Sequence, residues 1–166
     1  SLGIDVIITD HHETPEILPP AFATINPKQK DCKYPFDSLC GAALIYKLIL
    51  AILKKNNFSQ IKGSEKWHLD MVGLATLADM VPLRGENRVL ASYGLTVMRK
   101  SRRLGFVKLL RKLKVSQEHL SEDDIGFMIA PRINAASRIG HPVEAFNLLI
   151  EEDEVKADLL SSKLND

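Results

Sequence analysis

Three residues able to bind a metal follow one another in the stretch IITDHHETP, where an apolar run ends. They are Asp10, His11 and His12. A neutral imidazole is a good ligand for a divalent metal, and a neighbouring carboxylate commonly orients it by accepting its second N–H. The stretch therefore indicates a metal site with His11 or His12 as a ligand and Asp10 as a ligand or its support. A solvated turn with a capping aspartate is the alternative that these residues alone leave open.

A second candidate for metal chemistry is Asp79, in the segment ATLADMVPL. It stands at the end of a strongly apolar segment, before the break expected at Pro82. A carboxylate at the C-terminal end of a helix lies at the negative end of the helix dipole, and a cation would offset that repulsion. A capping or surface role remains open from the sequence alone.

The segment APRINAASRIGH interleaves polar side chains with small residues. Guanidinium groups bind phosphate oxygens in a bidentate manner, and amides and hydroxyls add hydrogen bonds to phosphate or sugar. We expect a loop that recognises nucleic acid, because the segment is too polar and too punctuated for a core element; a structural loop that bridges helices is the alternative. The candidate residues are Arg132, Asn134, Ser137, Arg138 and His141.

A basic stripe between residues 99 and 114 is the second candidate for phosphate contacts. It holds eight positive residues and no acid, in a chain whose formal net charge is only +1. Such asymmetry favours a phosphate-facing surface on a nearly neutral protein, and a solvated helix face is the alternative. The eight residues are Arg99, Lys100, Arg102, Arg103, Lys108, Arg111, Lys112 and Lys114.

Strands are expected to position the Asp-His-His stretch. Residues 3–10 form a continuous β-branched run, which is typical of a parallel strand buried on both faces, and residues 21–27 form a second short candidate strand. Ligands bind at the carboxyl edge of such sheets, where Asp10 and the histidines would lie. The predicted fold class is therefore α/β.

Helices are expected to follow the two strands. Ser38 is the expected cap of an almost uniformly apolar helix through residues 39–55, and a polar loop is expected at 56–65. Ser121 is the expected cap of a short helix over 122–130. The other predicted helices cover 66–80, 86–100, 104–113, 142–150 and 153–165.

The composition is that of an ordinary globular domain. The 166 residues are 45% hydrophobic and 26% charged, and no apolar stretch reaches the roughly 18 residues that a membrane helix needs. The two cysteines have no structural zinc spacing, so reduced thiols in a cytoplasm are expected. Both termini are expected to be cut ends, because a doubly buried strand begins at residue 2 and the last segment has no helix stop.

Five segments in order resemble the RecJ-like exonucleases, a family within the DHH phosphoesterase superfamily. They are VIITDHHETP, INPK, CGAALIYKL, LATLADMVPLRGENR and DIGFMIAPRINAASRIGH. Within the last two segments, ADMVPLRGENR and APRINAASRIGH are far more specific than the Asp-His-His triplet, which other phosphoesterases share. Ser137 and Ala75 stand where glycine is common, and neither change removes a ligand.

The resemblance implies roles for single residues. His11 and Asp79 would be metal ligands, His12 would contact the scissile phosphate, and Asp10 would support the site. Arg132, Asn134 and Arg138 would contact nucleic acid, with Ser137 and His141 beside them. Two divalent cations, Mn²⁺ or Mg²⁺, would serve phosphodiester hydrolysis.

The resemblance also implies how the chain is organised. Residues 1–100 would be the later part of a parallel-sheet DHH catalytic domain whose first two aspartate-rich motifs lie upstream. Residues 101–166 would be a mainly helical segment leading towards an absent C-terminal domain.

The implied function is single-stranded-DNA-specific exonuclease activity in DNA repair and recombination. Single-stranded DNA and other repair proteins would be partners, without membrane attachment, and the 166 residues alone would be inactive. The alternatives are a non-catalytic nucleic-acid-binding or assembly module of the DHH family, and a phosphoesterase acting on a small phosphorylated substrate.

Overall fold

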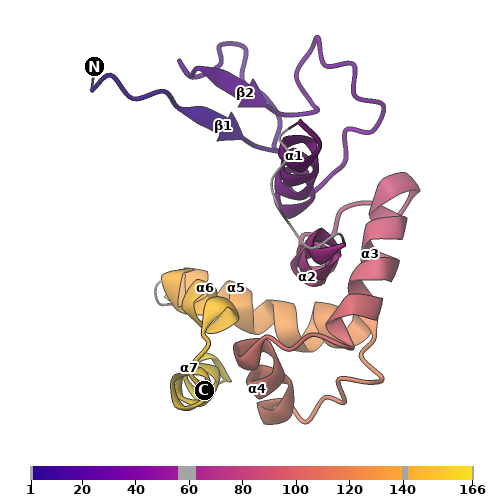
Figure 1. Ribbon diagram of the computed structural model, residues 1–166, viewed down its shortest axis with the longest axis vertical. Coiled ribbons are helices and arrows are strands. Elements are labelled where there is room, and N and C mark those ends of the chain that lie inside the picture. The colour runs from indigo at the N-terminus through magenta and orange to yellow at the C-terminus, as the bar shows by residue number, and fades with distance from the viewer. Residues whose placement is uncertain (1, 56–62, 140–141, 166) are drawn as a thin grey trace. The chain divides into compact units, whose positions relative to one another are not determined.

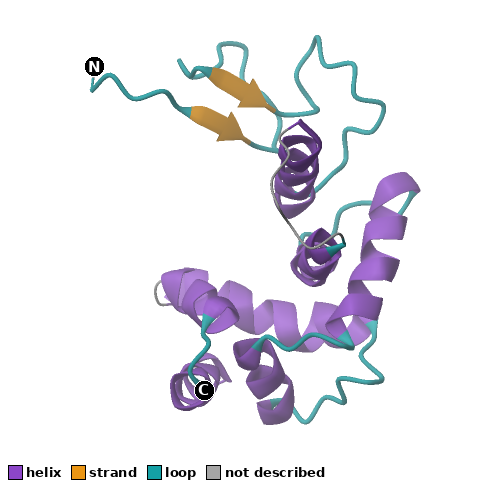
Figure 2. Cartoon of the chain, viewed as in Figure 1, coloured by secondary structure: helices purple, strands orange, loops and turns teal. Residues whose placement is uncertain are grey.

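The computed structural model describes residues 2–55, 63–139 and 142–165. The chain divides into two units, Ser1–Ser92 and Tyr93–Asp166, and the boundary falls within helix α3. Figure 2 shows that the strands belong to the first unit, whereas the second is built from helices and loops. None of the helices among the described residues is long and apolar enough to span a membrane.

The two predicted strands form a parallel pair. Strand β1 spans Ile7–Thr9 and strand β2 spans Ala23–Ile25, in the register Ile7↔Ala23 and Thr9↔Ile25 (Figure 1). Parallel pairing brings the carboxyl end of each strand to the same edge of the sheet. Asp10 therefore follows β1 directly at this edge, and its backbone N–H donates to Ile25 O at 3.0 Å.

The expected burial of the first strand on both faces is wrong for the described residues. Ile4, Val6 and Ile7, all within the predicted strand, are 72%, 51% and 56% exposed. A continuous β-branched run predicts a strand that is covered on both faces. Here helix α1 contacts β1, and the apolar residues before the strand extend beyond that contact.

Helices α1 and α2 build the core of the first unit. Helix α1 spans Gly41–Lys55, and α2 spans Leu69–Ala78 after a short 3-10 helix at Ser64–His68. Helix α1 is apolar as predicted but is buried on one side only, and Ser38 donates its hydroxyl to Asp37 rather than capping the helix. Most of the predicted polar loop, residues 56–62, lies outside the described residues. The shared core contains Leu39, Cys40, Ala43, Leu44, Tyr46 and Val72.

Helix α2 ends where its sequence stops favouring a helix. Asp79 is the C-cap, and Met80 adopts a positive φ of 54°. Because a residue that precedes proline disfavours the helical region, Val81-Pro82 cannot extend the helix. The chain turns and re-enters a helix at α3, Gly85–Met98.

The second unit is helical, as most of its sequence predicts. Helix α4 spans Leu104–Lys112, α6 spans Pro142–Ile150 and α7 spans Glu154–Asn165. Gly105 allows a very close approach of α4 to α6, since a Cβ built there would lie 1.7 Å from Leu148 O. The fully buried side chains of this unit include Met98, Phe106, Leu109, Leu110, Leu120, Ile125, Ile129 and Leu148.

The predicted loop is wrong for residues 130–139, because helix α5 spans Ala130–Ile139; residues 140–141 lie outside the described residues. A π-helix, Asp124–Ile129, runs directly into it. Ser121 caps this start as predicted: its hydroxyl accepts from the N–H of Asp124, whose carboxylate accepts from the N–H and hydroxyl of Ser121. Pro131 follows the π-helix closely, so it lies inside a continuous helical run, just after the wider turn that the π-helix makes. The proline and the polar residues of this segment are typical of a loop, and they account for the wrong prediction.

Candidate metal centre

Asp10 organises the turn that follows β1. Its Oδ1 accepts from the backbone N–H of His11 at 2.8 Å and from that of His12 at 3.3 Å. The same oxygen lies 2.7 Å from His12 Nδ1. The hydrogen bond from the His12 ring, followed by those from the two backbone N–H groups, holds the pKa of Asp10 below its usual value. Asp10 is thus an ionised carboxylate that fixes both histidines.

The contact with Asp10 also fixes the proton on His12. An ionised carboxylate only accepts hydrogen bonds, so Nδ1 of His12 carries the proton. The side chain of His12 is 76% exposed. Its Nε2 is therefore the nitrogen available to a ligand in solvent, and the ring is held in one orientation by Asp10.

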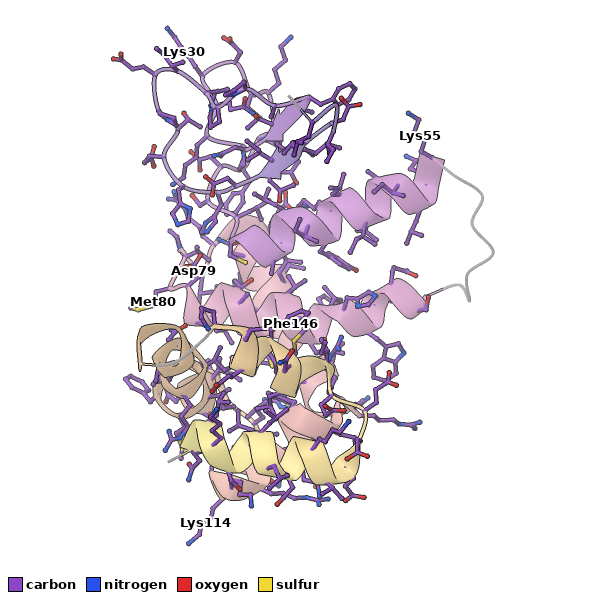
Figure 3. The ribbon with its side chains drawn as sticks, turned by 90° about the vertical axis from the view of Figure 1, so that its left-hand side faces the viewer. Lys30, Lys55, Asp79, Met80, Lys114 and Phe146 are labelled. Atoms are coloured by element: carbon purple, nitrogen blue, oxygen red, sulfur yellow. The ribbon has the colours of Figure 1, made fainter. Side chains whose placement is uncertain are left out.

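His11 and Asp79 come together from positions that lie far apart in the chain. His11 Nδ1 lies 3.5 Å from Asp79 Oδ2, with side chains 19% and 43% exposed. This separation is longer than a good N–H···O hydrogen bond. Figure 3 shows Asp79 beside Met80 at the end of α2. The structure therefore brings the side chains of His11 and Asp79 close together without a direct hydrogen bond between them.

The His11 ring also rests against the first residue of α1. A Cβ built on Gly41 would lie 3.4 Å from His11 Cδ2 and 3.9 Å from Nε2. On the next residue back, Cys40 Sγ lies 3.4 Å from Thr76 Oγ1 of α2, and Thr76 donates to Val72 O at 2.7 Å. The start of α1 thus contacts both the histidine and the helix that ends at Asp79.

Asn26 is a supporting residue that the sequence reasoning missed. Its side chain is only 3% exposed, and its Nδ2 donates to His12 O at 2.9 Å. Its Oδ1 accepts from the N–H of Lys28 at 2.9 Å. The segment INPK carried the signal, because an asparagine followed by proline after a strand suits such a turn. The turn after β1 is therefore held from β2 as well.

The number of ligands limits what this centre holds. Among the residues that the structure describes, no group of three or more His, Cys, Asp or Glu side chains is arranged to hold a metal ion. His11 and Asp79 supply one nitrogen and one carboxylate donor. These two donors would fill only part of the coordination sphere of a metal ion.

The predicted nucleic-acid residues fall on α5, and only part of them is described. Arg132 donates from Nη1 to Met128 O at 2.8 Å and from Nε to Asn165 Oδ1 at 3.2 Å. Asn134 is exposed. The side chains of Ser137 and Arg138, and all of His141, lie outside the described residues.

Much of the basic stripe is engaged inside the second unit. Arg99 donates from Nε and Nη2 to Leu120 O at 2.9 and 2.6 Å. Lys108 pairs with Glu154 at 2.8 Å, and Lys112 pairs with Asp158 at 3.2 Å. At least three of the eight members therefore make contacts within the second unit, an arrangement that neither the phosphate-facing surface nor the solvated helix face predicts.

Comparison with known proteins agrees with the geometry. The sequence model described as DHH family, N-terminal domain, matches residues 1–76. The chain is 38% identical over 164 residues to the single-stranded-DNA-specific exonuclease RecJ of Bacillus subtilis. The matched region covers 99% of this chain and 20% of that protein. The chain thus spans about a fifth of the length of that relative.

Solved structures give the same result. RecJ from Thermus thermophilus in complex with Mn²⁺ superposes with a TM-score of 0.81 at 30% identity, over 98% of this chain and 24% of that one. RecJ from the same organism in complex with Mg²⁺ gives a TM-score of 0.72 at 28% identity, over 85% of this chain and 21% of that one. Residues 1–76 are therefore similar to the N-terminal domain of the DHH family, and nearly the whole chain is similar to part of the RecJ exonucleases.

Proposed function

We propose that this chain is the central part of a metal-dependent exonuclease that acts on single-stranded DNA. One observation carries the proposal: His11 and Asp79, brought within 3.5 Å from two separate elements, form a metal-type pair beside an oriented second histidine. The similarity to RecJ supports the substrate class. The first two aspartate-rich motifs and the C-terminal domain belong to the rest of the proposed protein.

The two donors fit a divalent cation of the kind found in the RecJ structures. His11 Nδ1 and Asp79 Oδ2, 3.5 Å apart, would be close enough to hold one such ion together. Imidazole suits borderline transition ions and carboxylate suits harder ions, so the mixed pair is compatible with Mn²⁺ or Mg²⁺. When bound, a pair of such ions activates water and stabilises charge in phosphodiester hydrolysis.

His12 and Asp10 have a separate task in the proposed enzyme. Asp10 holds the Nδ1 proton of His12, so the exposed Nε2 is directed to solvent in a fixed orientation. A protonated His12 donates a hydrogen bond from Nε2 to a phosphoryl oxygen, where charge develops during the reaction.

Nucleic-acid contacts are assigned to the second unit. Arg132, Asn134, Ser137, Arg138 and His141, together with the exposed members of the basic stripe, would hold the strand through its phosphates. Backbone contacts carry little sequence information, so sequence preference is expected to be low. The proposed protein works in the cytoplasm in DNA repair and recombination, with repair proteins as further partners.

The 166 residues alone are proposed to lack nuclease activity. Two protein donors leave most of a cation's coordination sphere to water, and such an ion is held weakly. DNA binding by the chain should persist in weak form and should fall steeply as salt concentration rises, because Lys and Arg contacts to phosphate release counterions.

The test uses the natural full-length gene product. It should degrade single-stranded DNA in Mn²⁺ or Mg²⁺, spare duplex DNA, and lose activity in chelator. A substrate panel adds inorganic pyrophosphate and a cyclic dinucleotide. Hydrolysis of either small substrate with none of DNA would replace the proposal by the small-substrate phosphoesterase, and DNA binding without any hydrolysis would replace it by the non-catalytic module.

A further inference from the structure

Three consecutive residues at the start of α3 contact the segment that leads into α1. Gly85 has a φ of 52°, and a Cβ built on it would lie 3.0 Å from Phe36 Cε2. Glu86 accepts from the hydroxyl of Tyr34 at 2.6 Å and pairs with Lys47 of α1. We call Gly85, Glu86 and Asn87 the 85–87 clamp.

The ionic part of the clamp is strong for a partly exposed group. Burial by itself raises the pKa of Glu86, but the hydrogen bonds from Lys47 and Tyr34 outweigh it and leave that pKa below the usual value. Burial likewise opposes the charge on Lys47, and the contact with Glu86 raises the Lys47 pKa above its usual value. Glu86 thus fastens the start of α3 to α1.

Asn87 is the member of the clamp that reaches two segments at once. Its side chain is fully buried, and its Nδ2 donates to Ser38 O at 2.6 Å and to Pro82 O at 3.1 Å. Ser38 lies three residues before Gly41, against which the His11 ring rests. Pro82 lies three residues after Asp79. The Asn87 amide therefore connects the segment before α1, which supports His11, to the turn after α2, which follows Asp79.

The orientation of the Asn87 amide is determined by its partners. Both are carbonyl oxygens, which only accept, so the NH₂ group must face them. The Oδ1 atom is consequently buried, and it has no hydrogen-bond partner among the described residues. An unsatisfied buried acceptor destabilises a fold. The two donated bonds are therefore the contribution of this side chain.

We propose that Asn87 is a positioning residue that sets the separation of His11 and Asp79 and thereby the metal affinity of the centre. This inference rests on the proposed metal site. Asn87 does not reach the metal or the substrate; it acts through the backbone at Ser38 and Pro82. Such supporting contacts typically change metal affinity about 10- to 100-fold when they are removed.

The second unit offers a matched control in Gln117. Its Nε2 also donates to two backbone carbonyls, those of Met98 at 2.9 Å and Ser101 at 2.8 Å. Asn87→Asp and Gln117→Glu make the same chemical change and remove the same kind of bonds. Only the first is expected to change metal binding.

The experiment measures Mn²⁺ binding by electron paramagnetic resonance in the full-length protein, together with the melting temperature and nuclease activity at several Mn²⁺ concentrations. Asn87→Asp should raise the Mn²⁺ Kd at least about 10-fold, with activity recovering at high Mn²⁺, while Gln117→Glu leaves the Kd unchanged. Asn87→Ser, which adds no charge, serves if the aspartate variant does not fold. His11→Ala is measured alongside.

Each result has a defined meaning. An unchanged Mn²⁺ Kd in a folded Asn87 variant, with binding lost in His11→Ala, overturns the positioning role and leaves the metal site in place. An equal rise in Gln117→Glu overturns it too, because the effect would then be one of general stability. Unchanged binding in His11→Ala removes the metal assignment itself, and the inference with it.

Discussion

Two groups of charged side chains, one in each unit, are arranged in opposite ways. In the first unit, His11 and Asp79 approach to 3.5 Å without a direct hydrogen bond, and a carboxylate beside them orients a second histidine. In the second unit, Lys108 and Lys112 on α4 pair with Glu154 and Asp158 on α7. The first arrangement leaves donors available to a ligand, whereas the second satisfies charges within the fold. A run of charges in a sequence does not tell these cases apart.

The largest expected effect comes from removing one of the paired ligands in the first unit. His11→Ala and Asp79→Ala should each lower the nuclease rate of the full-length protein more than about 100-fold, because loss of a ligand weakens metal binding directly. Rates are measured on single-stranded DNA, and circular dichroism checks the fold. The control is His119→Ala, since His119 is an exposed histidine of the second unit. Loss of activity in the control as well would break the comparison.

A packing change in the second unit should affect stability rather than chemistry. Gly105→Ala places a Cβ 1.7 Å from Leu148 O, which forces α4 away from α6 and should lower the free energy of unfolding by about 3 kcal/mol. Gly126→Ala is the control, because a Cβ there meets nothing within 4 Å. Urea denaturation measures both. Equal stability of the two variants would contradict the close approach of α4 to α6.

The Asp10 contact should have an intermediate effect. Asp10→Asn removes the charge that holds the Nδ1 proton of His12, and we expect a rate about 10-fold lower with Mn²⁺ binding nearly kept. Asp31→Asn, a change of an exposed aspartate on the loop after β2, should leave the rate unchanged. Metal binding lost in Asp10→Asn would instead make Asp10 a ligand.

The smallest effect concerns the ion pairs of the second unit. The hydrogen bond from Lys108 lowers the pKa of Glu154 from its usual value. A lowered folded-state pKa stabilises the fold above the unfolded-state pKa, and that stabilisation disappears as pH falls through the folded-state value. In Lys108→Met, the melting temperature should therefore fall less steeply than in the unchanged protein as the pH drops below about 4.5. An unchanged acid profile would show that this surface pair contributes nothing measurable.

The sequence predicts the elements of the first unit well where local signals agree with the fold. The two strands follow from β-branched runs, and the stop near Asp79 follows from Pro82, because a proline disfavours a helix before it. Burial of the first strand was mispredicted, since the faces of a strand are covered by distant segments that local pattern does not identify.

The sequence predicts less of the second unit. The segment 130–139 reads as a loop because of Pro131 and its polar residues, yet it forms α5, which continues the π-helix before it. Pairing of Lys108 and Lys112 depends on α7, which lies more than 40 residues further along. Asn26 and Asn87 escaped notice for a similar reason: their roles arise from contacts with backbone carbonyls of other segments.

The central claim is that His11 and Asp79 hold one cation while His12 does not. Calorimetric titration of the full-length protein with Mn²⁺ tests it most directly, with His11→Ala, Asp79→Ala and His12→Ala measured side by side. The account predicts that binding is lost or weakened more than about 10-fold in the first two variants and nearly kept in the third. Binding lost in His12→Ala and kept in His11→Ala would reverse the roles of the two histidines and contradict the account.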